Sequence, residues 1–284
     1  MIVITGATGH LGRLVIEKLL QRVKPSEIAV VVRNREKAAD FASRGIEVRQ
    51  ADYDKPDSLR GAFRGADKVL LISANEVGRR LPQHRNVIEA AKADGAKMIV
   101  YTSLLNAAKS GIRSLAEEHF GTEELIRSSG MPYVILRNGW YIENYSENLG
   151  PVLQYGAVAG SAGDGRVAAA TREDYAEAAA AVLTGSGHEG KIYELAGDRA
   201  FSLSELASEV AKASGKNVVY NDLPPDNYRD MLIGVGLPAL VAEMLVDADL
   251  GLKRGELDSS SDDLRHLIGR PTTPMADVIR QAVR

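Results

Sequence analysis

Short, continuously apolar runs alternate with amphipathic stretches through the first half of the chain. The runs read IAVVV, VLLIS, MIVYTS and YVILR, without the polar alternation of a strand that faces water on one side. Strands buried on both faces have this pattern, and βα alternation with short connections favours a parallel sheet covered by helices on both sides. The sequence therefore predicts an α/β protein with a doubly wound parallel sheet.

The expected elements follow from this alternation. We predict strands at Ile2–Thr5, Glu27–Val32, Ile46–Arg49, Lys68–Ile72, Lys97–Thr102 and Tyr133–Leu136, and helices at His10–Gln21, Arg35–Arg44, Lys55–Arg64, Pro82–Asp94 and Leu115–Ser129. The pattern changes after Arg137: a helix at Arg172–Leu183 and a strand at Lys191–Leu195 precede a mostly helical remainder. In that remainder, Ser202 and Glu205 match a capping box, and Thr273 with Pro274 opens the last helix as cap and first residue.

A glycine-rich turn, Gly6-Ala7-Thr8-Gly9-His10-Leu11-Gly12, directly follows the first strand and opens the first helix. In this context Gly6 permits the tight turn, Gly9 lets backbone amides approach a pyrophosphate, and Gly12 lets helix and strand pack closely. The helix N-terminus offers N–H groups and a positive dipole end to phosphates. The alternative is a turn without a ligand, but the strand–turn–helix context favours a Rossmann-type dinucleotide site.

The end of the second strand bears on which nucleotide binds. An acidic residue there would accept a hydrogen bond from the ribose 2′-OH of NAD, but the chain reads Val31-Val32-Arg33-Asn34-Arg35. Arg33 can pair with a 2′-phosphate. We therefore predict NADPH as the cofactor.

Other residues at strand ends are less specific. Ser73 and Asn75 follow the fourth strand and would line the cofactor groove. Asp52, after the third strand, either contacts the adenine amino group or caps the next helix. Arg79 and Arg80 are expected to be solvated, unless a cofactor phosphate recruits Arg80.

The turn GATGHLG and the strand end Tyr101–Ser103 resemble the extended and atypical short-chain dehydrogenases/reductases. Members that interconvert carbonyls and alcohols use a Tyr with a Lys four residues later, and none of the ten tyrosines here has that spacing. His119 and Glu123 stand where the pair should be, and Glu123 cannot supply the cation that lowers a tyrosine pKa. This argues against an epimerase or an ordinary alcohol dehydrogenase.

Several further segments narrow the resemblance. VVRN, RQADY, PQHRNVIEAAK, LRNGWYIENY, AGDGRVAAATR and GHEGKIYELAGD together resemble the bacterial NmrA-like reductases, over essentially the whole chain. The resemblance implies a Rossmann domain with a small, mostly helical C-terminal lobe, NADPH bound without flavin, and a cleft for a flat aromatic acceptor such as a quinone. Carried over by position, the NADPH contacts are Gly6, Thr8, Gly9, His10, Leu11, Gly12, Arg33, Ser73, Asn75, Asn138, Gly139, Trp140, Tyr141 and Glu143. Residues 1–137 would form the NADP-binding core, and residues 138–284 the substrate loop, final strand and small lobe.

The polar and aromatic segment after the sixth strand, Asn138–Tyr145, holds the only tryptophan. An apolar pocket with a few polar groups suits an aromatic substrate. Tyr141 is expected to face it, whereas Trp140 and Tyr145 could equally anchor the small lobe. Asn138 or Asn144 could hydrogen-bond the nicotinamide amide or a substrate oxygen.

Quinone reduction would also explain the missing Tyr–Lys pair. Hydride transfer gives a hydroquinone anion, whose pKa lies far below that of an alkoxide, so solvent or His119 could deliver the proton. The catalytic candidates are His119, Tyr141 and Asn144, and none has an assigned acid–base role. His119 could equally be a polar helix residue near the surface.

Composition excludes other classes. The chain has no cysteine, a net charge of −3, no histidine at metal-ligand spacing and no apolar run that approaches the roughly 18–20 residues of a membrane span. These features predict no metal, no nucleic-acid partner and no membrane segment, and a cytoplasmic protein. A homodimer stays open. Two alternatives to the quinone reductase remain: an NADP(H)-sensing regulator of the NmrA type without turnover, and a triarylmethane-dye reductase.

Overall fold

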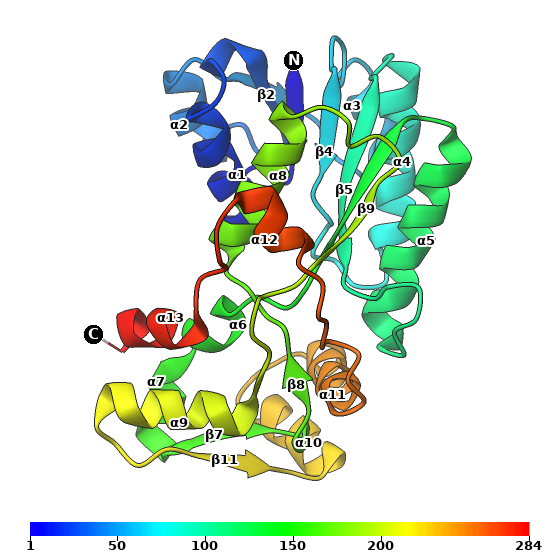
Figure 1. Cartoon of the computed structure of the whole chain (residues 1–284). Helices are drawn as coiled ribbons and strands as arrows, with labels where there is room; N and C mark the ends of the chain where they lie inside the picture. Colours follow the sequence, from blue (N-terminus) through cyan, green and yellow to red (C-terminus); the bar gives the residue numbers. More distant parts are fainter. Residues whose placement is uncertain (284) are drawn as a thin grey trace. The chain divides into compact units, whose positions relative to one another are not determined.

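The computed structural model describes residues 1–283. Its first compact unit comprises Met1–Ala107, Glu117–Asn138 and Arg172–Glu194, and its second comprises Ala108–Ala116, Gly139–Thr171 and the chain from Leu195 onward. The chain thus passes between the two units several times (Figure 1). No helix in the described part of the chain is long and apolar enough to cross a membrane.

A seven-stranded parallel sheet forms the centre of the first unit. Its strands are β1 (Ile2–Thr5), β2 (Ile28–Val32), β3 (Glu47–Gln50), β4 (Lys68–Leu71), β5 (Met98–Leu104), β6 (Tyr133–Asn138) and β9 (Ile192–Leu195). They lie in the order β3-β2-β1-β4-β5-β6-β9, which reverses direction between β1 and β4. Dinucleotides bind at such a reversal, at the carboxyl ends of the strands. The prediction of a Rossmann-type doubly wound sheet is confirmed.

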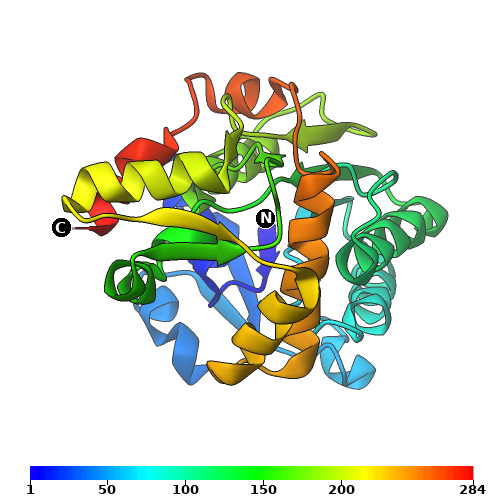
Figure 2. The ribbon, with the colours of Figure 1, turned by 90° about the horizontal axis from the view of Figure 1, so that it is seen from below.

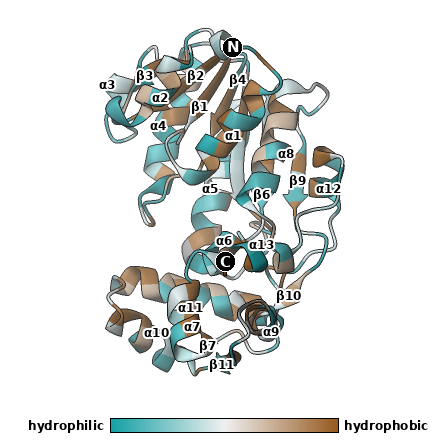
Figure 3. Cartoon of the chain, turned by 90° about the vertical axis from the view of Figure 1, so that its left-hand side faces the viewer, coloured by the Kyte–Doolittle hydropathy of each residue, from teal (hydrophilic) through white to brown (hydrophobic). Residues whose placement is uncertain are grey.

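Helices cover both faces of this sheet. They are α1 (His10–Leu20), α2 (Ala39–Ser43), α3 (Pro56–Leu59), α4 (Arg80–Ala93), α5 (Arg113–Ser129) and α8 (Arg172–Thr184), with short 3₁₀ turns at Pro25–Glu27 and Glu36–Ala38. Helices α1 and α8 pack against each other on one face, and α4 and α5 lie on the other (Figure 1). Colouring by hydropathy shows apolar strands beneath helices with polar outer surfaces (Figure 3).

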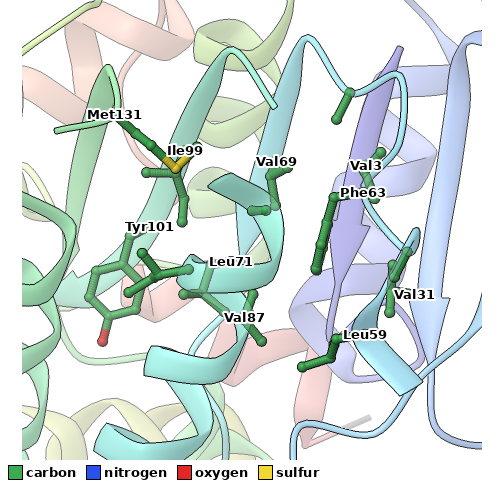
Figure 4. Close-up of a cluster of buried hydrophobic side chains, with 14 of the residues drawn as sticks. Val3, Val31, Leu59, Phe63, Val69, Leu71, Val87, Ile99, Tyr101 and Met131 are labelled. Carbon is green, nitrogen blue, oxygen red and sulfur yellow. The ribbon is translucent and has the colours of Figure 1, made fainter. Parts of the chain in front are cut away.

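The core under α3, α4 and α5 explains the continuous apolar runs. Val3, Val31, Val69, Leu71 and Ile99 project from four parallel strands and are at most 2% exposed. They contact side chains of the covering layer, namely Leu59, Phe63, Val87 and Met131 (Figure 4). Tyr101 belongs to the same cluster, but its hydroxyl points away from the other labelled side chains (Figure 4).

The second unit is built from short strands and helices. Its helices are α6 (Glu143–Ser146), α7 (Leu149–Tyr155), α9 (Leu203–Ser214), α10 (Pro225–Gly234), α11 (Ala239–Lys253), α12 (Asp263–Ile268) and α13 (Met275–Ala282). Strand β7 (Ala157–Gly160) pairs in parallel with β11 (Val219–Asp222), and β8 (Arg166–Val167) pairs antiparallel with β10 (Phe201–Ser202). Helix α9 runs along β7 and β11 (Figure 2). The mostly helical C-terminal region is confirmed.

Some predicted elements were wrong in detail. The helix expected at Lys55–Arg64 ends at Leu59, because Arg60 is already extended, with a ψ of 120°, and Gly61 follows with a left-handed φ of +80°. The helix expected at Arg35–Arg44 is a 3₁₀ turn followed by the five-residue α2. Pro274 is the cap of α13 rather than its first residue, whereas the Ser202–Glu205 capping box is confirmed.

Candidate functional site

The glycine turn joins β1 to α1 and leaves the start of that helix open. Gly6 has a φ of +62°, and its carbonyl oxygen accepts the Gly9 N–H at 3.0 Å. A Cβ on Gly12 would lie 2.4 Å from the Gly6 carbonyl oxygen, so only glycine fits there. Gly9 caps α1 without a side-chain hydrogen bond, and no acidic residue occupies the first turn. The first N–H groups of α1, at His10, Leu11 and Gly12, therefore have no partner within the helix. Thr8 lies inside this turn.

Arg33 follows β2, and its side chain is 67% exposed. Its Nη1 lies 3.0 Å from Oε1 of Glu76, and Glu76 Oε2 lies 3.2 Å from Nη1 of Arg79. The Arg33 carbonyl accepts a hydrogen bond from the Gln50 side chain at 3.1 Å. Arg33 is therefore an accessible guanidinium on an anchored backbone, with a carboxylate as its exchangeable partner.

The residues after β4 are held by side chains from other elements. The Ser73 N–H donates to Thr102 Oγ1 at 2.9 Å, and the Ala74 N–H donates to His84 Nε2 at 3.0 Å. Asn75 is exposed. Arg80 donates from Nε to the Ala74 carbonyl at 2.5 Å and is only 8% exposed. The prediction of a solvated Arg80 was wrong, because the partly buried Glu118 supplies a counter-ion at 3.2 Å. Arg79 is exposed as expected.

The Asp52 side chain accepts a hydrogen bond within the turn that follows β3. Its Oδ1 accepts the Asp54 N–H at 3.1 Å, while α3 is capped by Lys55 without a side-chain bond. The cap alternative is therefore wrong for this helix.

His119 lies in α5 and is buried against β5. Its Nδ1 is 2.8 Å from the Tyr101 hydroxyl. Burial lowers the pKa of His119 well below its ordinary value, and the nearby Arg80 charge acts in the same direction. Burial also raises the pKa of Tyr101. Both groups are therefore neutral, and His119 is not the surface residue that its alternative interpretation required.

Glu123, one turn further along α5, stands where the lysine of the Tyr–Lys pair is expected. Its carboxylate is fully buried, which was not predicted from the sequence. It accepts hydrogen bonds from Ser103 Oγ at 2.6 Å and from Arg137 Nε at 2.8 Å. Arg137 also contacts Glu194 at 2.7 Å, and these carboxylates raise its pKa. The network joins α5 to the carboxyl ends of β5 and β6. No local signal marked Glu123, which stands between the polar residues Thr122 and Glu124, and its partners lie too far along the chain to be read from spacing.

In the second unit, the backbone of the segment after Asn138 is fixed by hydrogen bonds. Gly139 N–H donates to the Leu195 carbonyl at 2.8 Å, and the Trp140 carbonyl accepts from Ala170 at 3.2 Å. Tyr141 forms a bridge with Ala170 and, like Trp140, is half-buried. Glu143 and Asn144 begin α6, where Asn144 is exposed. Tyr145 contacts Phe201 edge-on with ring centres 6.1 Å apart, and burial raises its pKa.

Asp249, on α11, was not singled out from the sequence. Its Oδ2 accepts the Ser161 N–H at 2.7 Å. Burial raises the pKa of this carboxyl to about 6, and the Asp222 carboxylate adds to the shift. A Cβ on Gly160 would lie 2.7 Å from Asp249 Oδ2, so this strand position must stay small.

Comparison with known proteins places these features in a family. The model of the NAD(P)H-binding family matches residues 6–186. Quinone oxidoreductase 2 of Escherichia coli strain K12 is 52% identical over 98% of this chain and 97% of its own length.

Solved structures support the same family. A crystal structure of the NADPH-dependent quinone oxidoreductase of Escherichia coli with NADPH matches all of both chains at 51% identity, with a TM-score of 0.98. The triphenylmethane reductase of Citrobacter sp. complexed with NADP(H) matches 99% of this chain and 100% of its own at 40% identity, with a TM-score of 0.96. The resemblance to the NmrA-like reductases is confirmed, and this chain belongs to the NAD(P)H-binding family.

Proposed function

We propose that the protein is an NADPH-dependent reductase that transfers hydride to quinones or similar flat aromatic acceptors. The observation that carries this proposal is its 52% identity, over nearly the whole of both chains, with quinone oxidoreductase 2 of Escherichia coli. When bound, NADPH supplies the hydride from C4 of its nicotinamide ring. The remaining steps concern what this chain does for that transfer.

The turn between β1 and α1 fits the pyrophosphate of a dinucleotide. Gly12 has no room for a side chain, and the start of α1 carries neither a capping side chain nor an acidic residue. The unpartnered N–H groups and the positive end of the helix dipole attract phosphate. Gly6, Thr8, Gly9, His10, Leu11 and Gly12 are therefore our proposed pyrophosphate contacts.

Arg33 is the proposed partner of the 2′-phosphate. Its guanidinium is exposed and already holds one carboxylate, that of Glu76. A phosphate binds a guanidinium more strongly than an exposed carboxylate does, because it carries more negative charge. We infer that the 2′-phosphate displaces Glu76, which keeps Arg79 as a second partner at 3.2 Å.

Two further segments complete the proposed assignment. The remaining proposed NADPH contacts are Ser73, Asn75, Asn138, Gly139, Trp140, Tyr141 and Glu143. Tyr141, whose backbone is fixed by its bridge to Ala170, and the exposed Asn144 are proposed to contact the acceptor.

The final proton is proposed to come from water. A quinone that accepts a hydride becomes a hydroquinone anion and needs one more proton, and this anion is a weak enough base to take it from solvent. His119 is neutral and already bound to Tyr101, so it can offer at most a neutral N–H. The chain's main contribution is then to orient cofactor and acceptor.

Oxidation of NADPH and of NADH, followed by absorbance with benzoquinone and no added flavin, tests the proposal. We expect turnover with strong preference for NADPH. Arg33→Ala should erode that preference, whereas Arg60→Ala, at an exposed arginine paired with Asp57, should leave it unchanged. Tight NADPH binding without turnover of any acceptor would instead indicate a regulator.

A dye reductase is the second candidate, because the Citrobacter triphenylmethane reductase is 40% identical over its full length. Decolorisation of crystal violet under the same conditions distinguishes the two. A kcat/KM for the dye that exceeds the values for all tested quinones would favour this candidate.

A further inference from the structure

The connection between β4 and α4 is held at successive residues by side chains. The Ile72 N–H donates to Thr5 Oγ1 at 3.2 Å, and the Ser73 N–H donates to Thr102 Oγ1 at 2.9 Å. Both backbone polar groups of Ala74 are held, because its N–H is bound by His84 and its carbonyl by Arg80. A loop that follows the carboxyl end of a strand has no hydrogen bonds to neighbouring strands, so these side chains supply the partners of its backbone groups.

The bond to Ala74 fixes the protonation of His84. An amide N–H can only donate, so Nε2 of His84 must present its lone pair to Ala74 at 3.0 Å. The proton then sits on Nδ1, which donates to Thr122 Oγ1 at 2.9 Å. The Thr122 hydroxyl in turn donates to the Glu118 carbonyl at 2.8 Å. Burial lowers the pKa of His84 to about 3, so the imidazole stays neutral at working pH.

Arg80 holds the carbonyl of the same residue. Its Nε donates to the Ala74 carbonyl at 2.5 Å, and its Nη1 lies 3.2 Å from Oε2 of Glu118. The Arg80 backbone N–H donates to Oε1 of the same carboxylate at 3.1 Å. Two chains of contacts thus connect the Ala74 backbone to α5, one from its N–H through His84 to Thr122 and one from its carbonyl through Arg80 to Glu118.

We propose that His84 and Arg80 are positioning residues that fix the backbone on both sides of Ala74 and thereby the surface that Ser73 and Asn75 present to the nicotinamide nucleotide. Neither residue is proposed to touch the cofactor. Apolar packing would not need both imidazole nitrogens in directed hydrogen bonds, nor a buried guanidinium on a loop carbonyl. The inference rests on the proposed function, because it takes the loop as a cofactor contact.

The test compares three histidine variants. His84→Leu removes both hydrogen bonds at similar volume, His84→Gln keeps an acceptor that can reach Ala74, and His188→Leu is the control. His188 is also a histidine of the first unit, but it is bound to Tyr193. The measurements are the Kd of NADPH from fluorescence titration, the kcat and the KM of NADPH with benzoquinone as acceptor, and hydrogen exchange of the Ala74 amide.

His84→Leu should raise the Kd and KM of NADPH by about tenfold, because a buried amide loses its acceptor. Its kcat at saturating NADPH should stay within about threefold of wild type, and the Ala74 amide should lose its protection. His84→Gln should recover part of the NADPH affinity and part of the protection of the Ala74 amide, and His188→Leu should lose neither.

An unchanged Kd for NADPH in His84→Leu, with Ala74 deprotected, would overturn the proposal. If His84→Leu does not fold, Arg80→Lys takes its place, because it keeps a charge opposite Glu118 but loses the Nε–H on Ala74. A wild-type Kd in that variant would likewise overturn it. Failure of the wild-type protein to bind NADPH would contradict the proposed function instead, and so the two failures are distinguishable.

Discussion

Glu123 and Arg137 form a buried ion pair with two contacts, from Arg137 Nε to Glu123 Oε1 at 2.8 Å and from Nη2 to Oε2 at 2.7 Å. The pair joins α5 to the end of β6, where the chain leaves the sheet. Removal of Glu123 takes two hydrogen bonds and one of two neighbouring carboxylates from the buried Arg137 guanidinium, and such a loss is far more destabilising than replacement of the whole pair.

Glu123→Ala should therefore lower the free energy of unfolding by about 3 kcal/mol or more. Urea denaturation followed by circular dichroism measures the change. The matched control is Glu124→Ala at the next residue, whose carboxylate is 57% exposed and pairs with Arg127 on the surface. That variant should lose less than about 1 kcal/mol. Equal losses in both variants would contradict a special role for the buried pair.

Gly12→Ala should impair nucleotide binding. The new methyl group would lie 2.4 Å from the Gly6 carbonyl oxygen and 2.7 Å from Ala7 Cα, so the turn or the helix must shift. We expect the Kd of NADPH, measured by calorimetry, to rise at least about tenfold, because an oriented set of backbone N–H groups is displaced. Gly150→Ala in α7, where the added Cβ would meet nothing within 4 Å, is the control and should bind NADPH normally.

The sheet and the phosphate turn could be predicted because their signals are local. A continuous apolar run such as Ile28–Val32 indicates a strand buried on both faces, and a glycine pattern marks its own turn. Arg80 could not be placed from the sequence, because its partner Glu118 lies on another helix. The pairing of β7 with β11 joins segments about sixty residues apart, and these short strands carry little signal of their own.

Asp249 should make stability depend on pH. Its pKa in the folded protein is about 6, raised above the ordinary value of 3.8 by burial. The folded state thus binds this proton more tightly than the unfolded chain. The stabilisation is complete below about pH 4, declines as the pH rises to about 6, and is absent above, a change of about 3 kcal/mol.

Asp249→Asn should remove this decline and be more stable than wild type near neutral pH, because the amide oxygen still accepts the Ser161 N–H. Urea denaturation of both proteins at a series of pH values between about 4 and 8 gives the difference. Asp247→Asn, two residues earlier on α11, should follow the wild-type curve. A constant difference between Asp249→Asn and wild type across this range would show that the carboxyl is not titrating there.

Glu76 should weaken NADPH binding by competing for Arg33. Its carboxylate must leave the guanidinium, 3.0 Å away, before a 2′-phosphate can take its place. Glu76→Gln should therefore lower the Kd of NADPH about threefold and leave that of NADH unchanged, since an exposed ion pair contributes at most about 1 kcal/mol. The gain should shrink at high salt, which screens exposed charges. Glu36→Gln removes one negative charge from an exposed position near Arg33 in sequence and controls for net charge. An equal gain in NADH affinity, or the same gain in Glu36→Gln, would mean that Glu76 acts only through the overall field and not on the 2′-phosphate.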